Sequence, residues 1–363
     1  YYNPDFVTPN GTHREEGYVS ELVTKKALTW LEHQRNENQP FLLMVQHKAP
    51  HRDWSPAPKY LDLYDEVIFP EPDTLFDDYA GRGSAARDQD MTIDKSMFLG
   101  SDLKVDAFFT NRYERMNDAQ IKIFKKAYTS ENKFLLENQL SGKELVRWKY
   151  QRYLKDYLRC VKSVDDCVGE LWNWLDEKDM LENTIFVYSS DQGFYLGEHG
   201  WYDKRFIYDE SFKTPLLIKW PNKIKPGITN DEMVQNLDFA QTFLEAAGIS
   251  SPEDMQGESL IPLLTGNEDT WTRKEVYYHY YEYPSVHMVK RHYGIVNKEY
   301  KLVRFYYDVD EWELYDRLND PNEMNNVYND PNYSEVVKDL KVKLAELRVK
   351  YNDSEELDKK YMY

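Results

Sequence analysis

Hydrophobic and polar positions follow two different patterns along this chain. In its first part, short apolar runs at residues 40–46, 184–189 and 214–220 lie between longer stretches that mix polar and apolar residues. Residues 17–35 and 119–179 carry apolar side chains every three or four positions, which predicts amphipathic helices. Short apolar runs between helices are typical of buried parallel strands. This order predicts an α/β layer with a mostly parallel sheet flanked by helices.

The pattern of apolar and polar residues changes after residue 265. Residues 276–283, 288–297, 300–307 and 312–315 form short runs that predict strands in meander order, and residues 333–350 have one apolar helical face. We therefore predict two parts. Residues 1–265 would belong to the α/β domain, and residues 266–363 would form a small antiparallel sheet with a terminal helix.

Composition narrows the classes of partner. The chain has 363 residues, is 41% hydrophobic and 30% charged, and carries a formal net charge of −18. Such an acidic balance argues against nonspecific nucleic-acid binding, which needs basic surface. No apolar run approaches the roughly 18 residues that a membrane span requires, so no membrane partner is predicted. An anionic ligand would need a local cationic pocket.

The two cysteines, Cys160 and Cys167, lie within a predicted helix. Seven helical residues separate them by roughly 10 Å. A disulfide needs Cα atoms within about 7 Å, so we expect both to be small buried side chains.

The most informative stretch follows the predicted strand at residues 184–189. It begins with Asp191 and Gln192, and it continues to His199, Lys204 and Arg205. Side-chain oxygens suit Ca²⁺ or Mg²⁺, and cations suit an anion. Asp-Gln-Gly also suits a plain turn, and the two cations could be solvated.

A second basic motif, His47-Lys-Ala-Pro-His51, directly follows the predicted strand at residues 40–46. Ligands bind at the carboxyl ends of strands in open α/β sheets. Lys48 could hold an anion there, and His51 could protonate a leaving group. A basic surface loop is the simpler interpretation.

Together these motifs resemble the type I, formylglycine-dependent sulfatases. The resemblance is carried by residues 190–204, 48–51, 279–284, 290–294, 300–302 and 312–316. It is strongest to bacterial N-acetylglucosamine-6-sulfatase-like and heparan-type enzymes. It implies an alkaline-phosphatase-like fold, a periplasmic or secreted bacterial enzyme, and a sulfated carbohydrate as substrate. The expected substrate is 6-O-sulfated N-acetylglucosamine or a related glycosaminoglycan or mucin sugar.

The resemblance also implies roles for individual residues. Asp191 and Gln192 would be ligands of Ca²⁺, with Mg²⁺ as the alternative. Lys204 and His51 would be catalytic, the first holding the sulfate and the second protonating the leaving alcohol. The remaining expected contacts with substrate are Lys48, Glu198, His199, Arg291 and His292.

One departure from the family pattern changes the expectation. The family's formylglycine arises from Cys-x-Pro/Ala-Ser-Arg, but Val-Lys-Ser follows Cys160 and Val-Gly-Glu follows Cys167. We therefore expect a chain that lacks the N-terminal part of the domain. We expect it to be inactive alone and to need that segment, or a second copy, as a partner.

Two other functions stay open. A phosphatase or phosphodiesterase of the alkaline phosphatase superfamily would usually need more Asp and His ligands. A noncatalytic sulfated-glycan-binding protein would keep the cations and lack the nucleophile.

Overall fold

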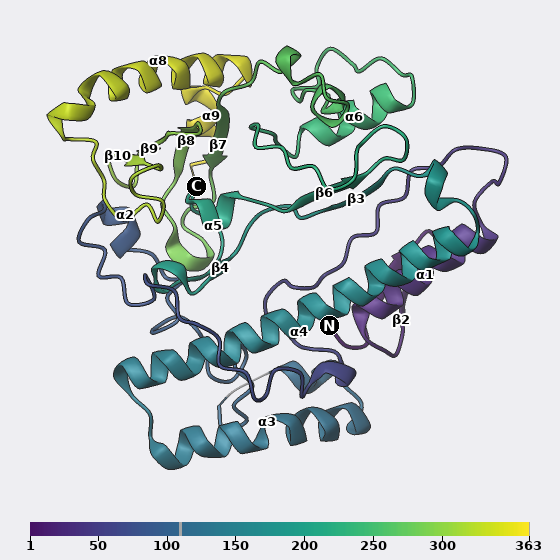
Figure 1. The fold of residues 1–363 in the computed structure, drawn as a ribbon. Helices are drawn as coiled ribbons and strands as arrows, with labels where there is room; N and C mark the ends of the chain where they lie inside the picture. The colour runs from purple at the N-terminus through teal and green to yellow at the C-terminus, as the bar shows by residue number, and fades with distance from the viewer. Residues whose placement is uncertain (109–110, 363) are drawn as a thin grey trace. The chain divides into compact units, whose positions relative to one another are not determined.

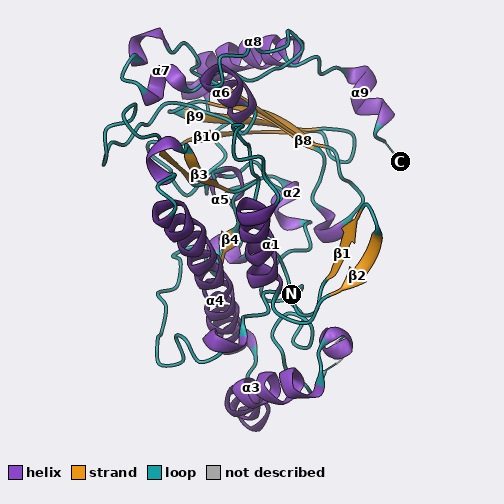
Figure 2. Cartoon of the chain, turned by 90° about the vertical axis from the view of Figure 1, so that its right-hand side faces the viewer, coloured by secondary structure: helices purple, strands orange, loops and turns teal. Residues whose placement is uncertain are grey.

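The computed structural model describes residues 1–108 and 111–362, and these form two compact units. The first unit comprises residues 1–72 and 92–183, and the second comprises residues 73–91 and 184–363. Figures 1 and 2 show the ribbon in two views. The predicted boundary between residues 265 and 266 does not coincide with the division into units and stays a prediction. Within the described ranges, no helix is long and apolar enough to cross a membrane.

The first unit is mainly helical. Its longest helix packs against a shorter one, side by side in both views (Figures 1 and 2). A buried carboxylate, Asp156, ties the long helix to a neighbouring segment through Lys104 at 2.9 Å, and it pairs with Arg159 of the same helix at 3.0 Å. The elements are the hairpin β1 (Asp5–Thr8) and β2 (Gly11–Arg14), and the helices α1 (Val19–His33), α3 (Asp118–Asn138) and α4 (Gly142–Glu177).

The second unit contains a four-stranded antiparallel sheet in the order β10-β9-β8-β7. The strands are β7 (Val276–Tyr280), β8 (His292–Val296), β9 (Tyr300–Phe305) and β10 (Glu311–Asp316), and α8 (Ser334–Lys350) follows them. The turn between β8 and β9 closes where Asn297 Oδ1 accepts from the backbone of Glu299 and Tyr300. The predicted C-terminal sheet, hairpin and helix are confirmed.

Each face of this sheet is covered by a different part of the chain. Helix α8 covers one face in both views, and Leu340 and Leu344 pack there with Ile295, Leu302 and Leu314 (Figures 1 and 2). The other face packs on a hydrophobic cluster. Its members from the segment 195–208 are Tyr195, Trp201, Phe206, Ile207 and Tyr208. The sheet is therefore the platform that positions the candidate motif.

The rest of the second unit consists of short elements. They are α2 (Ser84–Arg87), β3 (Phe186–Ser189), β4 (Tyr195–Leu196), β5 (Tyr202–Asp203), α5 (Asp209–Phe212), β6 (Leu216–Lys219), α6 (Asp238–Ala246), α7 (Ile261–Leu264) and α9 (Glu355–Lys360). Helix α6 ends before Gly248, which lies in the left-handed region at φ 72°.

The expected parallel sheet does not form among the described residues. Strands β3 and β6 pair with each other, and their pairing is antiparallel. Residues 41–46, predicted as a buried strand, are extended without strand pairing, and Leu42 and Met44 are more than two-thirds exposed. A strand forms only where a neighbour completes its hydrogen bonds. Within the described ranges, no backbone hydrogen bond of residues 41–46 is found.

Candidate functional site

The loop after β3 carries the predicted metal ligands. The side chain of Asp191 is exposed, and its Oδ1 accepts from the backbone of Gln192 at 3.2 Å. Gly193 then approaches the backbone so closely that a Cβ atom there would lie 2.1 Å from the carbonyl oxygen of Glu210. Only glycine fits at this position, because the path of the loop passes directly beside the backbone of helix α5. That path leaves the Asp191 carboxylate facing solvent.

A cluster of charges forms around Asp203, at the end of β5. Its Oδ1 lies 3.2 Å from Lys204 Nζ and 3.3 Å from Arg205 Nη1. Its Oδ2 lies 2.8 Å from His287 Nε2, and His287 Nδ1 faces the carbonyl oxygen of Asp90 at 2.6 Å. Two permanent cations thus share one carboxylate. A second carboxylate, that of Glu282, lies 3.9 Å from Arg205 Nε.

The electrostatics of Asp203 support this arrangement. Burial raises the pKa of its carboxyl, but the hydrogen bond from His287 and the charges of Lys204 and Arg205 outweigh burial. The pKa therefore lies well below its usual value, and the carboxylate stays ionised. An ionised Asp203 holds both cations in place.

Arg205 is the most unusual member of the cluster. Its backbone lies in the left-handed region, with φ 123°, which strains any residue other than glycine. Its buried Nε and Nη1 atoms have no hydrogen-bond partner among the described residues. Nη1 lies 3.3 Å from Asp203 Oδ1 and Nε lies 3.9 Å from Glu282 Oε2, so both donors are in ion pairs with carboxylates.

Glu198 and His199 do not form the expected sugar-binding surface. The His199 side chain is fully buried, with its ring nitrogens 3.6 Å from Asp77 and 3.5 Å from Glu210. Glu198 is half-buried, its Oε2 accepts from the backbone of Leu196 at 2.6 Å, and burial raises its pKa. His199 therefore lies in the core, where its ring packs against Trp201 and Tyr208.

Arg291 and His292 are also turned inward, contrary to the expectation that they close a substrate pocket. Arg291 bonds to Asp308 at 2.8 Å and to the carbonyl oxygen of Tyr281 at 3.1 Å. His292 is fully buried, and burial lowers its pKa to about 3. Arg291 directly precedes β8 and His292 is its first residue, so both buried side chains lie at the start of that strand.

Lys48 and His51 lie in the first unit. Both are exposed, and the backbone N–H of His51 donates to the carbonyl oxygen of Lys48 at 2.9 Å. His51 Nδ1 lies 2.7 Å from the carbonyl oxygen of Arg52. The ring is thus oriented, and its roles in the reaction stay predictions.

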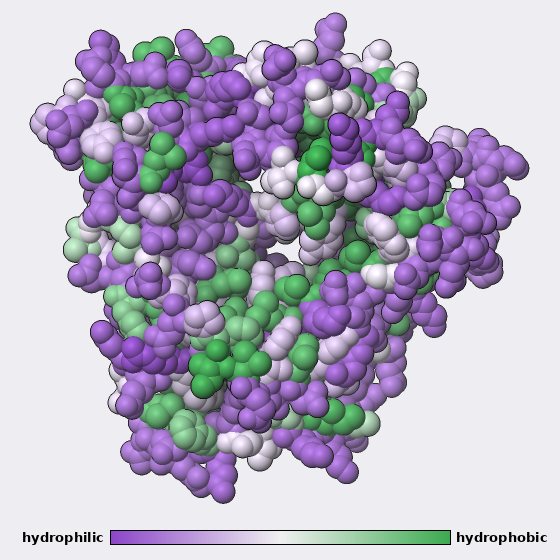
Figure 3. Space-filling model, in the orientation of Figure 1, coloured by the Kyte–Doolittle hydropathy of each residue, from purple (hydrophilic) through white to green (hydrophobic). Residues whose placement is uncertain are grey.

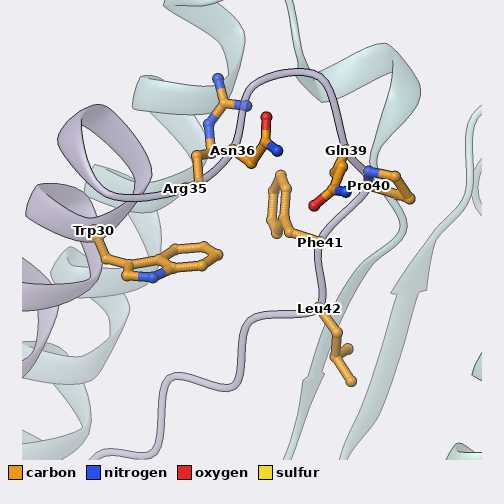
Figure 4. A pocket seen from close by; sticks show the side chains of 7 residues that line it. All are labelled: Trp30, Arg35, Asn36, Gln39, Pro40, Phe41 and Leu42. Atoms are coloured by element: carbon orange, nitrogen blue, oxygen red, sulfur yellow. The ribbon is translucent and has the colours of Figure 1, made fainter.

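A shallow pocket opens elsewhere in the first unit. It lies between the end of α1 and the extended residues 39–42, and in Figure 4 the rings of Trp30 and Phe41 lie next to one another, in an edge-to-face contact with 5.9 Å between centroids. None of the predicted site residues lines this pocket.

Comparisons with known proteins place the chain. The family model "Sulfatase" matches residues 1–249, and the model "N-sulphoglucosamine sulphohydrolase, C-terminal" matches residues 197–350. The chain belongs to the sulfatase family. Sulfatases use a formylglycine and a divalent metal, and the resemblance inferred from the motifs is confirmed.

Individual relatives agree with this assignment. The N-acetylglucosamine-6-O-sulfatase of Bacteroides thetaiotaomicron is 46% identical over 98% of this chain and 66% of its own length. A solved protein in complex with its substrate D-glucosamine-2-N,6-O-disulfate is 45% identical over 98% of this chain and 74% of its own, with a TM-score of 0.94. This sulfatase chain thus spans about two-thirds of the curated relative.

A more distant neighbour shows the fold alone. The phosphonate monoester hydrolase of Silicibacter pomeroyi is 20% identical, with a TM-score of 0.68 over 96% of this chain and 65% of its own. The neighbours confirm the predicted alkaline-phosphatase-like fold class.

The sequence motifs did not reveal the full charge cluster. Asp203 stood inside the motif without a role, and His287 lies 84 residues further along the chain. Nothing in the local pattern around His287 marked it. Only the packing of the segment after β7 beside β5 joins the two.

Proposed function

We propose that this chain is part of a sulfatase that hydrolyses sulfate esters of a sulfated sugar. The expected sugar is 6-O-sulfated N-acetylglucosamine or a related glycosaminoglycan or mucin sugar. The observation that carries the proposal is the pair of cations, Lys204 and Arg205, held by one buried carboxylate. The names of the relatives support the choice of sugar.

In this proposal Lys204 binds a sulfate oxygen. Charge builds on the nonbridging and leaving oxygens during sulfuryl transfer, so fixed cationic donors lower the barrier most. Asp203 orients Lys204 and Arg205, and His287 orients Asp203. His51 is proposed as the acid that protonates the leaving alcohol.

The proposed metal is Ca²⁺, with Mg²⁺ as the alternative. Asp191 offers carboxylate oxygens that face solvent, and Gln192 offers an amide oxygen, a donor set that suits a hard cation. Two such residues fit part of a calcium shell of six to eight oxygens. When bound, the ion would polarise the sulfate oxygens.

The same proposal extends to partners and location. The short apolar run at residues 41–46 has no strand partner in the described part of the chain, which supports a polypeptide partner, either a further segment of the domain or a second copy of the chain. A periplasmic or secreted location is proposed by analogy with bacterial enzymes that degrade sulfated glycans.

Binding of N-acetylglucosamine 6-sulfate to the 363-residue chain tests the anion site. We expect calorimetry to detect binding of the sulfate ester and at least tenfold weaker binding of the unsulfated sugar. Lys204→Ala should lower affinity by about 10–100-fold, because a charge-assisted contact is lost. Release of sulfate is measured in parallel.

Lys225→Ala is the matched control, because this lysine is exposed in the same unit. Equal affinity of wild type, Lys204→Ala and Lys225→Ala would contradict the proposed site. Preference for the 6-phosphate over the 6-sulfate would point instead to a phosphatase.

A further inference from the structure

A second polar cluster lies apart from the Asp203 cluster, between the sheet and the last helix of the second unit. It joins His279 on β7, Asp353 after α8 and Asp358 on α9. One ligand-type atom from each side chain lies within 4.8 Å of the others. Among the described residues, this is the one group of three or more such side chains that could hold a metal ion. None of its members belongs to the proposed sulfate site.

A carboxylate orients the imidazole of His279 from its Nδ1 side. Its Nδ1 lies 2.6 Å from Asp353 Oδ2, and the ring stacks on Tyr281 with a centroid distance of 3.7 Å. A carboxylate that accepts from Nδ1–H fixes the tautomer in which Nε2 carries a lone pair. Metal-binding histidines in proteins usually have this carboxylate support.

The second candidate ligand faces that nitrogen. Asp358 is 3% exposed, and its Oδ1 is buried without a hydrogen-bond partner in the part of the chain that the structure describes. This oxygen lies 3.6 Å from His279 Nε2. Two ligands bound at about 2.0–2.1 Å in tetrahedral geometry lie about 3.4 Å apart. The pair is therefore spaced for a shared ion.

The charge balance of the cluster leaves room for a cation. One guanidinium, that of Arg348, lies 2.8 Å from Asp358 Oδ2 and 3.6 Å from Asp353 Oδ2. Apart from the imidazole, two carboxylates face one guanidinium, and these three groups carry a net charge of −1. The Tyr306 hydroxyl, 2.5 Å from His279 Nε2, is the group that must move to admit an ion.

We propose that His279 Nε2 and Asp358 Oδ1 bind a zinc-like transition-metal ion, with Asp353 positioning the imidazole. A nitrogen ligand favours zinc over the calcium that all-oxygen sites prefer. The ligands come from β7 and α9, so the ion would fasten the C-terminal helix to the sheet. The site is structural and separate from the proposed sulfatase chemistry.

Titration of the metal-free 363-residue chain with Co²⁺ tests the proposal. Saturating Ca²⁺ is present, so that the oxygen ligands Asp191 and Gln192 are occupied. We expect one Co²⁺ per chain, seen by its visible absorption and displaced by Zn²⁺. His279→Gln and Asp358→Asn should each weaken binding at least tenfold. Glu356→Gln, the same change at an exposed position of α9, should leave it unaltered.

A wild-type measurement guards against variants that fail to fold. Anomalous diffraction from zinc-soaked crystals should place an ion about 2.1 Å from His279 Nε2. An ion bound elsewhere, no ion at millimolar zinc, or equal Co²⁺ affinity in folded His279→Gln and Asp358→Asn would overturn the proposal.

Discussion

The sequences of the four-stranded sheet β7–β10 and of the apolar run 41–46 both predict strands. In the described part of the chain, only those of the sheet pair with neighbouring strands. Ile295, Leu302 and Leu314 of the sheet are fully buried, and their strands pair in continuous register. Leu42 and Met44 are 68% and 69% exposed on an extended segment. Figure 3 shows that green apolar patches interrupt the mostly purple surface on the drawn face. An apolar run can therefore favour an extended conformation by itself, but its side chains are buried only where another segment packs against them.

Burial has a period of two in residues 41–46, whereas consecutive residues are buried in β8, β9 and β10. In residues 41–46, half-buried side chains alternate with exposed ones, as they do on a strand. The unit nevertheless leaves their backbone unpaired among the described residues. An exposed, apolar, unpaired segment is a template for another strand. The sheet, in contrast, is covered by α8 on one face.

The largest expected effect separates the two regions by stability. Leu302→Ala removes a fully buried side chain and should lower the free energy of unfolding by about 2–5 kcal/mol. Leu42→Ala makes the same chemical change at an exposed position and should lower it by less than about 0.5 kcal/mol. Urea denaturation of both variants measures the difference. Similar losses in the two would mean that residues 41–46 are buried in solution.

A smaller effect concerns pH and the sheet. His292 has a pKa of about 3 when folded, against about 6.5 in an unfolded chain. Between these values the unfolded chain binds a proton that the folded chain does not. His292 therefore makes stability fall by about 1.4 kcal/mol for each pH unit below about 6.

The variant His292→Phe keeps an aromatic ring against Phe206 and Phe305 and cannot titrate. Its stability, measured by urea denaturation from pH 7 to pH 4, should depend less steeply on pH than that of wild type. The comparison uses the slope, so a constant packing cost cancels. Parallel pH profiles would show that His292 is protonated in the folded protein.

The smallest effect on stability is expected for substitutions in residues 41–46, which should change the self-association of the chain instead. We expect the chain to self-associate, and Leu42→Lys with Met44→Lys to reduce this, because charge blunts an open strand edge. Sedimentation velocity measures the change. Lys substitutions at the exposed Ile228 and Ile249 serve as the control pair. A monodisperse wild-type monomer would break the comparison.

The candidate site divides along the same line as the fold. Asp191, Gln192 and Lys204 could be named from one contiguous motif, because residues close in sequence share a loop. Asp203 and His287 meet across 84 residues, and no local pattern predicts that contact. His199 and His292 were expected to contact substrate, but both are fully buried. A histidine carries the same letter in a core as in a site, and only its surroundings distinguish the two.

The sequence by itself determined the helices, the C-terminal meander and its hairpin, and the motif that identifies the family. These features follow from local periodicity, turn chemistry and contiguous residues. Only the tertiary structure decided which apolar runs pair, which histidines are buried, and that one carboxylate holds Lys204 and Arg205. Those outcomes depend on contacts between distant segments, because hydrogen bonds, burial and charge are satisfied by whatever the fold brings alongside.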